Sequence, residues 1–400
     1  MNARMRRQRG FSLVELMVAS AVGLVVALAV TTAIVSTARQ STILGGNAAA
    51  QSNAQIGLSL IDLAGRSAGA GFYNNGQALC PTWNAYNGST VIANNAPWMP
   101  VRIVSGGSSG SSDTIIFTGG GGSRPLSAAP LMDVTTGAII VVSNASDFAA
   151  GDLAVLGAAG EGDPCTLIQV SVAPSTPASC GGNATVCQLL VRNPNAGLNP
   201  GPGVFTTRPT YGFDNSGGAA APAVVSRVGT AASGFRQDAF TVQCNALVRY
   251  NAFTTTALPG CTGSPLSFGA GVDAMATDVV LLHAQYGVSN AASSDVVTQW
   301  VEASGTTWGG TPAQPDIGRI KAIRLVLVAR SREADSSQVS GPCTNTAGVA
   351  NTGPCSFEDA AAPVIDVSNV PVPAGRSWRN YRYRAHTSVI PLRSVIWSDS

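Results

Sequence analysis

Near its N-terminus the sequence reads Gly10-Phe11-Ser12-Leu13-Val14-Glu15-Leu16-Met17-Val18-Ala19, and an apolar run continues from this block to Ala38. Glu15 is the only charged residue between Gly10 and Ala38. A helix of about 20 apolar residues is long enough to cross the hydrocarbon core of a bilayer. The stretch therefore predicts a transmembrane helix close to the N-terminus.

The ten residues that lead into this helix are strongly basic. They read MNARMRRQRG, with arginines at Arg4, Arg6, Arg7 and Arg9. Basic residues beside a membrane span stay on the cytoplasmic side, so we expect the rest of the chain to lie outside the cytoplasm. A plain membrane anchor explains both features. An ordinary secretory signal, cut after Ser36-Thr37-Ala38, explains them too and would discard the whole apolar segment.

Neither interpretation explains Glu15. A carboxylate at the centre of a membrane helix costs about 2.5–3.5 kcal/mol on insertion scales, and one near the end costs less but still needs a partner. The block from Gly10 to Ala19 resembles the type IV prepilin signal, which pilins share with the pseudopilins of type II secretion. That resemblance implies that a prepilin peptidase cuts after Gly10 and methylates the new amine of Phe11. It also implies that Glu15 meets the N-terminus of a neighbouring subunit, where a buried cation and carboxylate offset each other's desolvation.

The helical pattern continues beyond the membrane segment. Ile56, Leu60 and Leu63 lie at positions i, i+4 and i+7 and predict an apolar stripe, with Ile61 alongside, that docks onto a globular domain. Gly45-Gly46 is expected to interrupt the helix, either as a simple loop or as a flexible point between membrane and globular parts, because two glycines cost about 2 kcal/mol relative to alanine. The segment Gly65–Gly71 is expected to end it. We therefore divide the chain into a leader (1–10), a filament helix (11–66) and a globular domain (67–400).

The globular part reads as short strands between turns, rich in glycine in polar surroundings. Its fold class is α+β, a long N-terminal helix packed on an antiparallel sheet with long inserted loops. One helix is expected near 267–282. The expected strands are 114–118, 138–142, 153–156, a hairpin of 166–172 with 186–192, 322–330 and 386–393.

Eight cysteines lie beyond the apolar segment, at Cys80, Cys165, Cys180, Cys187, Cys244, Cys261, Cys343 and Cys355. They form no CxxC pair, and the chain has only two histidines, so a zinc site is disfavoured. An even number of scattered cysteines in an exported chain predicts disulfides. Cys244–Cys261 and Cys343–Cys355 each close a short loop, which is worth about 3 kcal/mol.

The sequence offers no catalytic set, no cofactor site and no metal site. His283 lies in an apolar run and His386 in a basic strand, so both are interpreted as structural. Glu161 and Asp163 favour a solvated turn over a calcium site. A C-terminal basic and aromatic cluster is expected to contact protein or to cover a sheet face rather than to bind nucleic acid. Its members are Arg376, Trp378, Arg379, Tyr381, Arg382, Tyr383, Arg384 and Arg393.

Five segments in order along the globular part also resemble the PilW family of minor pilins. They are Leu63–Gly69 followed by Cys80, Gly151–Val155 before Cys165, Gln285–Val288, Ile320–Arg330, and Tyr383–Arg393. The long inserted loops and the additional cysteines depart from the family pattern. The resemblance implies a Cys80–Cys165 disulfide, which leaves Cys180 with Cys187.

A PilW-like protein is expected to be non-enzymatic, to prime type IV pilus assembly at or near the pilus tip, and to support adhesion or motility. Its partners would be other minor pilins, the major pilin, the prepilin peptidase, the inner-membrane assembly platform and a tip adhesin. It would begin in the inner membrane, with its globular domain in the periplasm, and end in the pilus. Two alternatives stay open: a minor pseudopilin of a type II secretion system, and a tip adhesin or DNA-capture subunit.

Overall fold

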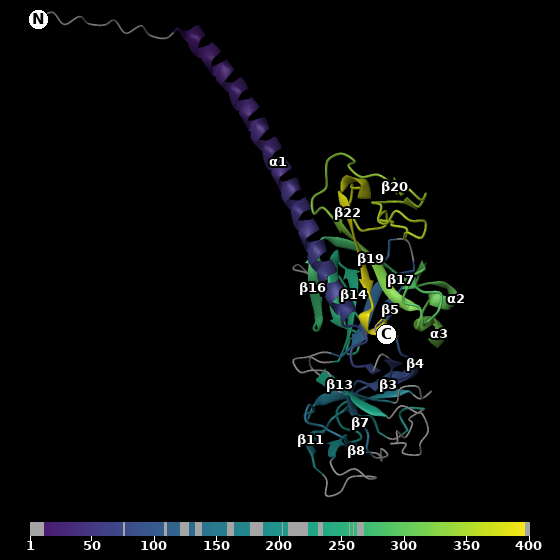
Figure 1. The fold of residues 1–400 in the computed structure, drawn as a ribbon. Coiled ribbons are helices and arrows are strands. Elements are labelled where there is room, and N and C mark those ends of the chain that lie inside the picture. The colour runs from purple at the N-terminus through teal and green to yellow at the C-terminus, as the bar shows by residue number, and fades with distance from the viewer. Residues whose placement is uncertain are drawn as a thin grey trace, which may run out of the picture.

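The computed structural model describes residues 12–74, 77–107, 110–120, 128–132, 138–157, 164–176, 187–201, 203–206, 223–230, 235–255, 257–258, 260–261 and 268–396. Its dominant element is the helix α1 (Leu13–Arg66), whose 54 residues extend for about 80 Å. The N-terminal half of α1 stands clear of the globular part as a stalk, and the C-terminal half lies against it (Figure 1). The chain thus has the predicted α+β architecture.

The helix is continuous through Gly45-Gly46, so the expected interruption is wrong. An added Cβ at Gly45 would meet nothing within 4 Å, which shows that this glycine is not required by a close contact. Each glycine costs about 1 kcal/mol of helix propensity, and the helical turns on both sides of the pair offset that cost. The helix does end at the expected point, with Ser67 as its C-cap.

Two antiparallel sheets form the part of the globular domain that lies beside α1 (Figure 1). The five-stranded sheet has the order β16-β15-β14-β6-β5. Its strands are β5 (Val101–Val104), β6 (Thr114–Gly119), β14 (Arg236–Gln243), β15 (Ala246–Asn251) and β16 (Val272–Thr277). The four-stranded sheet has the order β18-β17-β19-β22. Its strands are β17 (Val279–Val288), β18 (Gln299–Glu302), β19 (Ile320–Arg330) and β22 (Tyr383–Pro391).

The chain passes from one sheet to the other at Asp278, between β16 and β17. Asp278 has a φ of 63°, a left-handed conformation that turns the strand direction in a single residue. The helix expected at 267–282 is therefore wrong, because this region is two strands. Nearly all of β17 is buried, so its apolar residues form a continuous run, and such a run does not distinguish a buried strand from a helix.

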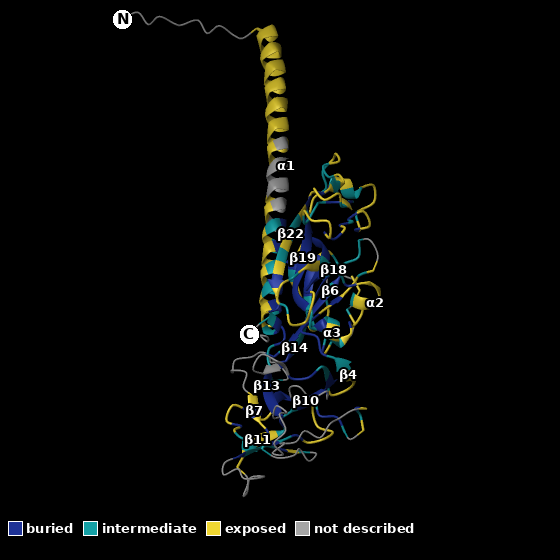
Figure 2. Cartoon of the chain, turned by 45° about the vertical axis from the view of Figure 1, so that its right-hand side comes forward, coloured by how far each residue is buried: buried dark blue, intermediate teal, exposed yellow. Residues whose placement is uncertain are grey.

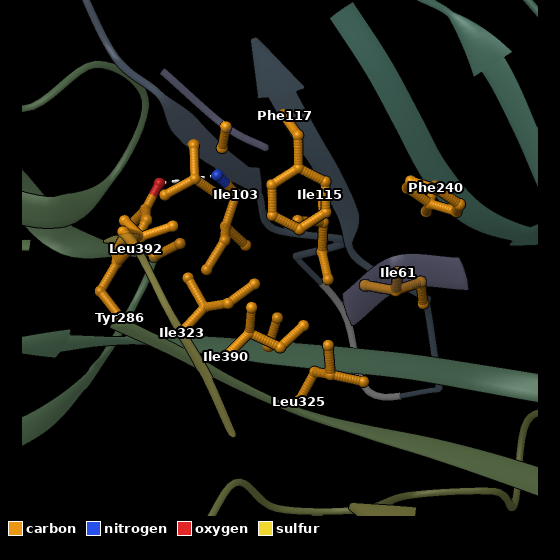
Figure 3. Packing of buried hydrophobic residues seen from close by; sticks show 14 of the residues in the cluster. Ile61, Ile103, Ile115, Phe117, Phe240, Tyr286, Ile323, Leu325, Ile390 and Leu392 are labelled. Carbon is orange, nitrogen blue, oxygen red and sulfur yellow. Dashed lines mark hydrogen bonds between the residues drawn. The ribbon is translucent and has the colours of Figure 1, made fainter. Parts of the chain in front are cut away.

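α1 contacts β16, β17, β19 and β22, and so covers both sheets where they meet. Small residues allow the approach. An added Cβ at Gly57 would lie 2.6 Å from Leu247 Cδ2, and one at Gly65 would lie 2.7 Å from Ile390 Cγ2. Ile61 is fully buried among core residues of both sheets (Figure 3).

A second set of strands lies beyond the C-terminal end of α1, and we call it the distal lobe (Figure 1). It contains a six-stranded sheet of order β4-β3-β10-β9-β13-β7 and a three-stranded sheet of order β11-β12-β8. The strands are β3 (Thr82–Tyr86), β4 (Val91–Pro97), β7 (Ala128–Pro130), β8 (Ile139–Val142), β9 (Asp152–Gly157), β10 (Cys165–Gln169), β11 (Val172–Ser175), β12 (Gln188–Val191) and β13 (Val224–Thr230).

The expected hairpin of 166–172 with 186–192 is only partly right. β11 does pair with β12, but β10 pairs with β9 and, in parallel, with β3. Phe72, just after α1, stacks on Trp98 with ring centroids 3.7 Å apart, which ties the end of the helix to the lobe. The remaining short elements are β1 (Tyr73–Asn74), β2 (Gln77–Ala78), α2 (Gly305–Trp308), α3 (Gln314–Ile317), β20 (Cys343–Thr344), β21 (Ala350–Asn351), η1 (Trp378–Asn380) and α4 (Arg393–Ile396).

The close approach at Gly57 gives a first prediction. Gly57→Val places a branched side chain against Leu247 and should lower the free energy of unfolding by about 1–3 kcal/mol, the usual cost of overpacking a core. Urea unfolding of the full chain in detergent, followed by near-UV circular dichroism, measures this. Gly45→Ala is the matched control and should not destabilise, because open space surrounds that position. Equal stability of Gly57→Val and the wild type would contradict the packing described.

Candidate functional site

The N-terminus of α1 is the candidate functional site, and Glu15 lies in its first turn. Ser12 is the N-cap, and its side chain accepts a hydrogen bond from the backbone N–H of Glu15 at 3.2 Å. The Glu15 carboxylate in turn accepts from the backbone N–H of Ser12 at 3.1 Å. This capping box gives Glu15 a partner within its own chain. Gly10 and Phe11 lie outside the described residues, so cleavage, methylation and an intersubunit contact of Glu15 stay predictions.

The helix from Leu13 to Val35 is long and apolar enough to span a membrane, with a mean hydropathy of 2.5, and none of it is buried. Figure 2 shows this exposure along the upper part of α1. Its hydroxyl groups turn back onto the helix: Ser20, Thr31 and Thr32 each donate to a backbone carbonyl three or four residues earlier. Glu15 is the only residue in this span with an ionisable side chain. This surface suits lipid or other apolar helices.

The C-terminal half of α1 has two different faces. Ala50, Ala54 and Ile61 are buried against the sheets. By contrast, Ile56 is 50% exposed and Leu63 is 67% exposed. The predicted docking stripe is therefore only partly right: Ile61 is buried in the core and Leu60 packs partly against it, whereas Ile56 and Leu63 face outward. Small residues let the helix backbone approach the sheets, Ile61 fills the core between them, and Ile56 and Leu63 are left on the outside.

Two family models match the chain, one near its N-terminus and one in its C-terminal third. Residues 5–31 match the model for the prokaryotic N-terminal methylation motif. Residues 267–394, from just before β16 to the end of β22, match the model for PilW, the type IV pilus-assembly protein W. The two matches support a type IV pilin-like PilW protein. No curated protein and no solved structure matches it.

The PilW match covers the four-stranded sheet. Gly287 and Arg324 belong to the segments of this sheet that resemble PilW, and their contacts show their structural roles. An added Cβ at Gly287 would lie 2.6 Å from Trp300 Cζ3, so glycine makes room for the indole ring. Arg324 lies between that ring and Phe357, with its guanidinium carbon 4.9 and 4.5 Å from the two centroids. Arg324 donates to both Asp359 oxygens, at 2.5 and 3.1 Å, and this lowers the pKa of Asp359. These PilW residues therefore stabilise the fold.

The structure contains the disulfides Cys80–Cys165, Cys244–Cys261 and Cys343–Cys355. These are the pairs that the short loops and the family resemblance favoured. Cys187 is also disulfide-bonded, and Cys180 lies outside the described residues. Gly157 leaves the space that Cys80–Cys165 occupies, since an added Cβ would lie 2.5 Å from both sulfurs.

The basic and aromatic C-terminal cluster is partly engaged within the chain. Arg382 pairs with Asp335 at 3.1 Å, and Arg379 lies over Trp378. Among the described residues, no group of three or more His, Cys, Asp or Glu side chains is arranged to hold a metal ion. The turn with Glu161 and Asp163 lies outside that part of the chain.

His283 has a more specific role than the sequence indicated, because it links two carboxylates. Its Nδ1 lies 3.0 Å from Asp113 Oδ2 and its Nε2 lies 3.0 Å from Glu302 Oε2. Asp113 is buried just before β6 and also accepts hydrogen bonds from two backbone N–H groups, so His283 connects the two sheets. No spacing in the sequence marks Asp113 as its partner.

Burial opposes the charge on His283, but the hydrogen bond to Glu302 and the Asp113 carboxylate outweigh it and raise the pKa of His283 above 6.5. Burial also raises the pKa of Asp113, which His283 only partly offsets. Burial opposes the charge on Glu302, but the hydrogen bond and charge of His283, together with Gln285 and Arg324, outweigh it and lower the pKa of Glu302. Only a protonated imidazole donates to both carboxylates at once.

A pH dependence of stability follows. Because the folded pKa of His283 exceeds its unfolded value, its contribution is complete below pH 6.5 and is lost as the pH rises through the folded pKa. The free energy of unfolding should therefore contain a falling component above pH 6.5 that His283→Gln removes. Urea unfolding of the full chain at a series of pH values up to roughly pH 8.5 measures it.

His386→Gln is the control for this series. Burial and Arg384 lower the pKa of His386, so its titration lies below pH 6.5 and its replacement should leave the slope above that pH unchanged. An unchanged slope in His283→Gln would contradict the proposed link.

Proposed function

We propose that this chain is a minor pilin that primes type IV pilus assembly and sits at or near the pilus tip. The observation that carries the proposal is the position of the distal lobe, which extends the molecule beyond the C-terminal end of α1 (Figure 1). In a filament of parallel helices, a neighbour displaced along the axis would need that space. A subunit with nothing above it has no such conflict.

The distal lobe lies outside the matched family segments and has its own cores, and both features support a specialised role. Its strands lie between Thr82 and Thr230, outside the two segments that match family models. The lobe has apolar cores of its own and a buried ion pair, Arg227 with Asp152 at 2.8 Å. A buried pair of this kind is costly to break, so the lobe is built as a fixed body rather than as a flexible tail.

In this proposal the N-terminal segment carries out the steps that the family resemblance implies. A prepilin peptidase removes the basic leader, and the apolar half of α1 then anchors the protein in the inner membrane with the globular domain in the periplasm. Other minor pilins, the major pilin and the assembly platform are its partners. The exposed faces of α1 that carry Ile56 and Leu63 provide surface for neighbouring helices. The role is structural and requires no catalysis.

Glu15 is expected to act in assembly through its charge. Glutamine also completes a capping box, so Glu15→Gln keeps the local helix start while it removes the charge. We expect the variant to be cut and to yield a mature mass that begins at Phe11, yet to fail to co-purify with other minor pilins. Mass spectrometry and co-purification from membranes give the two readouts.

Ser12→Ala is the matched control, since it removes the cap, at a cost of about 1 kcal/mol, and retains the carboxylate. It should still assemble. If Ser12→Ala fails as completely as Glu15→Gln, the importance of Glu15 lies in capping rather than in assembly.

The tip position predicts a low copy number. Deletion of the gene should abolish or sharply reduce surface pili while the amount of major pilin in the membrane stays unchanged. Quantitative mass spectrometry of sheared pili should find this chain at a small fraction of the major pilin. A copy number close to that of the major pilin would exclude the tip role, and pili of normal number from a deletion strain would favour the type II secretion alternative.

A further inference from the structure

Between β19 and β22 the chain makes a long excursion, residues 331–382, that includes β20, β21 and η1. Figures 1 and 2 both show the part near β20 rising beside α1, toward the apolar N-terminal half of the helix. Arg324 of β19 holds this excursion in place through its contacts with Asp359 and Phe357, and the Cys343–Cys355 disulfide closes a loop within it. It is a fixed part of the fold that points toward the membrane segment.

A cleft of about 290 Å³ opens where the two ends of the excursion meet α1. Its lining is polar and basic, and includes Gln51, Arg330, Ser331, Ser340, Arg382 and Arg384. Arg384 is exposed and makes no hydrogen bond or ion pair in the described part of the chain. The cleft therefore offers a guanidinium group that is free to bind an anion.

The surface around the cleft carries more positive than negative charge. Six arginines gather there: Arg330, Arg332, Arg376, Arg379, Arg382 and Arg384. Three carboxylates accompany them: Asp278, Glu333 and Asp335. Asp278 pairs with Arg332 and Asp335 with Arg382, which leaves the remaining arginines in excess. Arg379 is exposed beside Trp378, whose ring it covers at 5.4 Å.

The location of this arginine surface decides which anion it meets. The cleft is level with Gln51, and Val35, the end of the candidate span, lies 16 residues or about 24 Å back along the helix. Headgroups fill part of that distance, and a tilt of α1 shortens the rest. Arginine matches phosphate oxygens in a bidentate geometry, and tryptophan is enriched where protein meets headgroups.

We propose that the arginine surface binds the phosphate groups of anionic phospholipids in the bilayer that anchors α1 before assembly. The contact would hold the globular domain down against the membrane and limit rotation about α1, so that the docking faces of the helix point in a fixed direction. The proposal rests on the membrane-anchored stage of the proposed function. It does not depend on a role in priming or at the tip.

The test uses the full-length mature chain in lipid nanodiscs. Amide hydrogen exchange of residues 376–384 is compared between discs of phosphatidylcholine alone and discs that also contain phosphatidylglycerol. We expect exchange to slow by roughly fivefold or more in the anionic discs, the factor that one arginine near an anionic surface supplies. The effect should disappear at high salt.

Two variants make the test specific. Arg376→Gln/Arg379→Gln/Arg384→Gln should remove the difference between the two kinds of disc. Arg102→Gln/Arg236→Gln/Arg249→Gln removes the same charge from the five-stranded sheet and should leave the difference intact.

Equal exchange in neutral and anionic discs would overturn the proposal. Protection that appears only when other minor pilins are added would also overturn it, and would assign the arginine surface to an acidic group on a partner subunit. Either result leaves the assembly defect of Glu15→Gln in place, so failure here is distinguishable from failure of the proposed function.

Discussion

The backbone of α1 lies so close to the two sheets at Gly57 and Gly65 that one added carbon at either position would meet a core side chain at less than 3 Å. The remaining packing of the sheets depends on this contact. β16 and β22 belong to different sheets, and α1 contacts both, so the helix closes the core along the line where the sheets meet. Where the backbone of α1 comes this close, the buried residue has to be glycine, Ile61 fills the core between the two glycines, and Ile56 and Leu63 of the neighbouring turns face outward.

That constraint explains which features the sequence predicted and which it did not. The membrane segment, the end of the helix and the α+β class follow from composition and local chemistry, which act over a few residues. The docking face did not follow, because the periodicity of large apolar residues selects Ile56 and Leu63, whereas close packing selects Ala50, Ala54 and Gly57. Helix periodicity shows that a face exists, but residue size relative to the opposing sheet decides which face is buried.

In the sheets and among the polar groups, too, local sequence patterns failed to predict features that depend on tertiary contacts. The turn at Asp278 separates two strands where the sequence favoured one helix, since the conformation of a single residue leaves no trace in apolar periodicity. The partnership of Asp113 with His283 joins residues 170 positions apart, and no local motif records it. The disulfides were more predictable, because a short closed loop or an ordered family pattern restricts the choice of partner.

The two faces of α1 also divide intramolecular from intermolecular contacts. Toward its C-terminal end, one face is committed to the sheets and the other is partly apolar and exposed; toward the N-terminal end, the whole circumference is apolar and exposed. Lipid can cover the N-terminal half before assembly and apolar helices can cover it afterwards, so exchange of one for the other has little hydrophobic cost. The C-terminal half of α1 lies outside the lipid, so its exposed face is in contact with water before assembly. Burial of Ile56 and Leu63 against a neighbour therefore removes apolar surface from water, and this half supplies a hydrophobic driving force for association that the membrane half lacks.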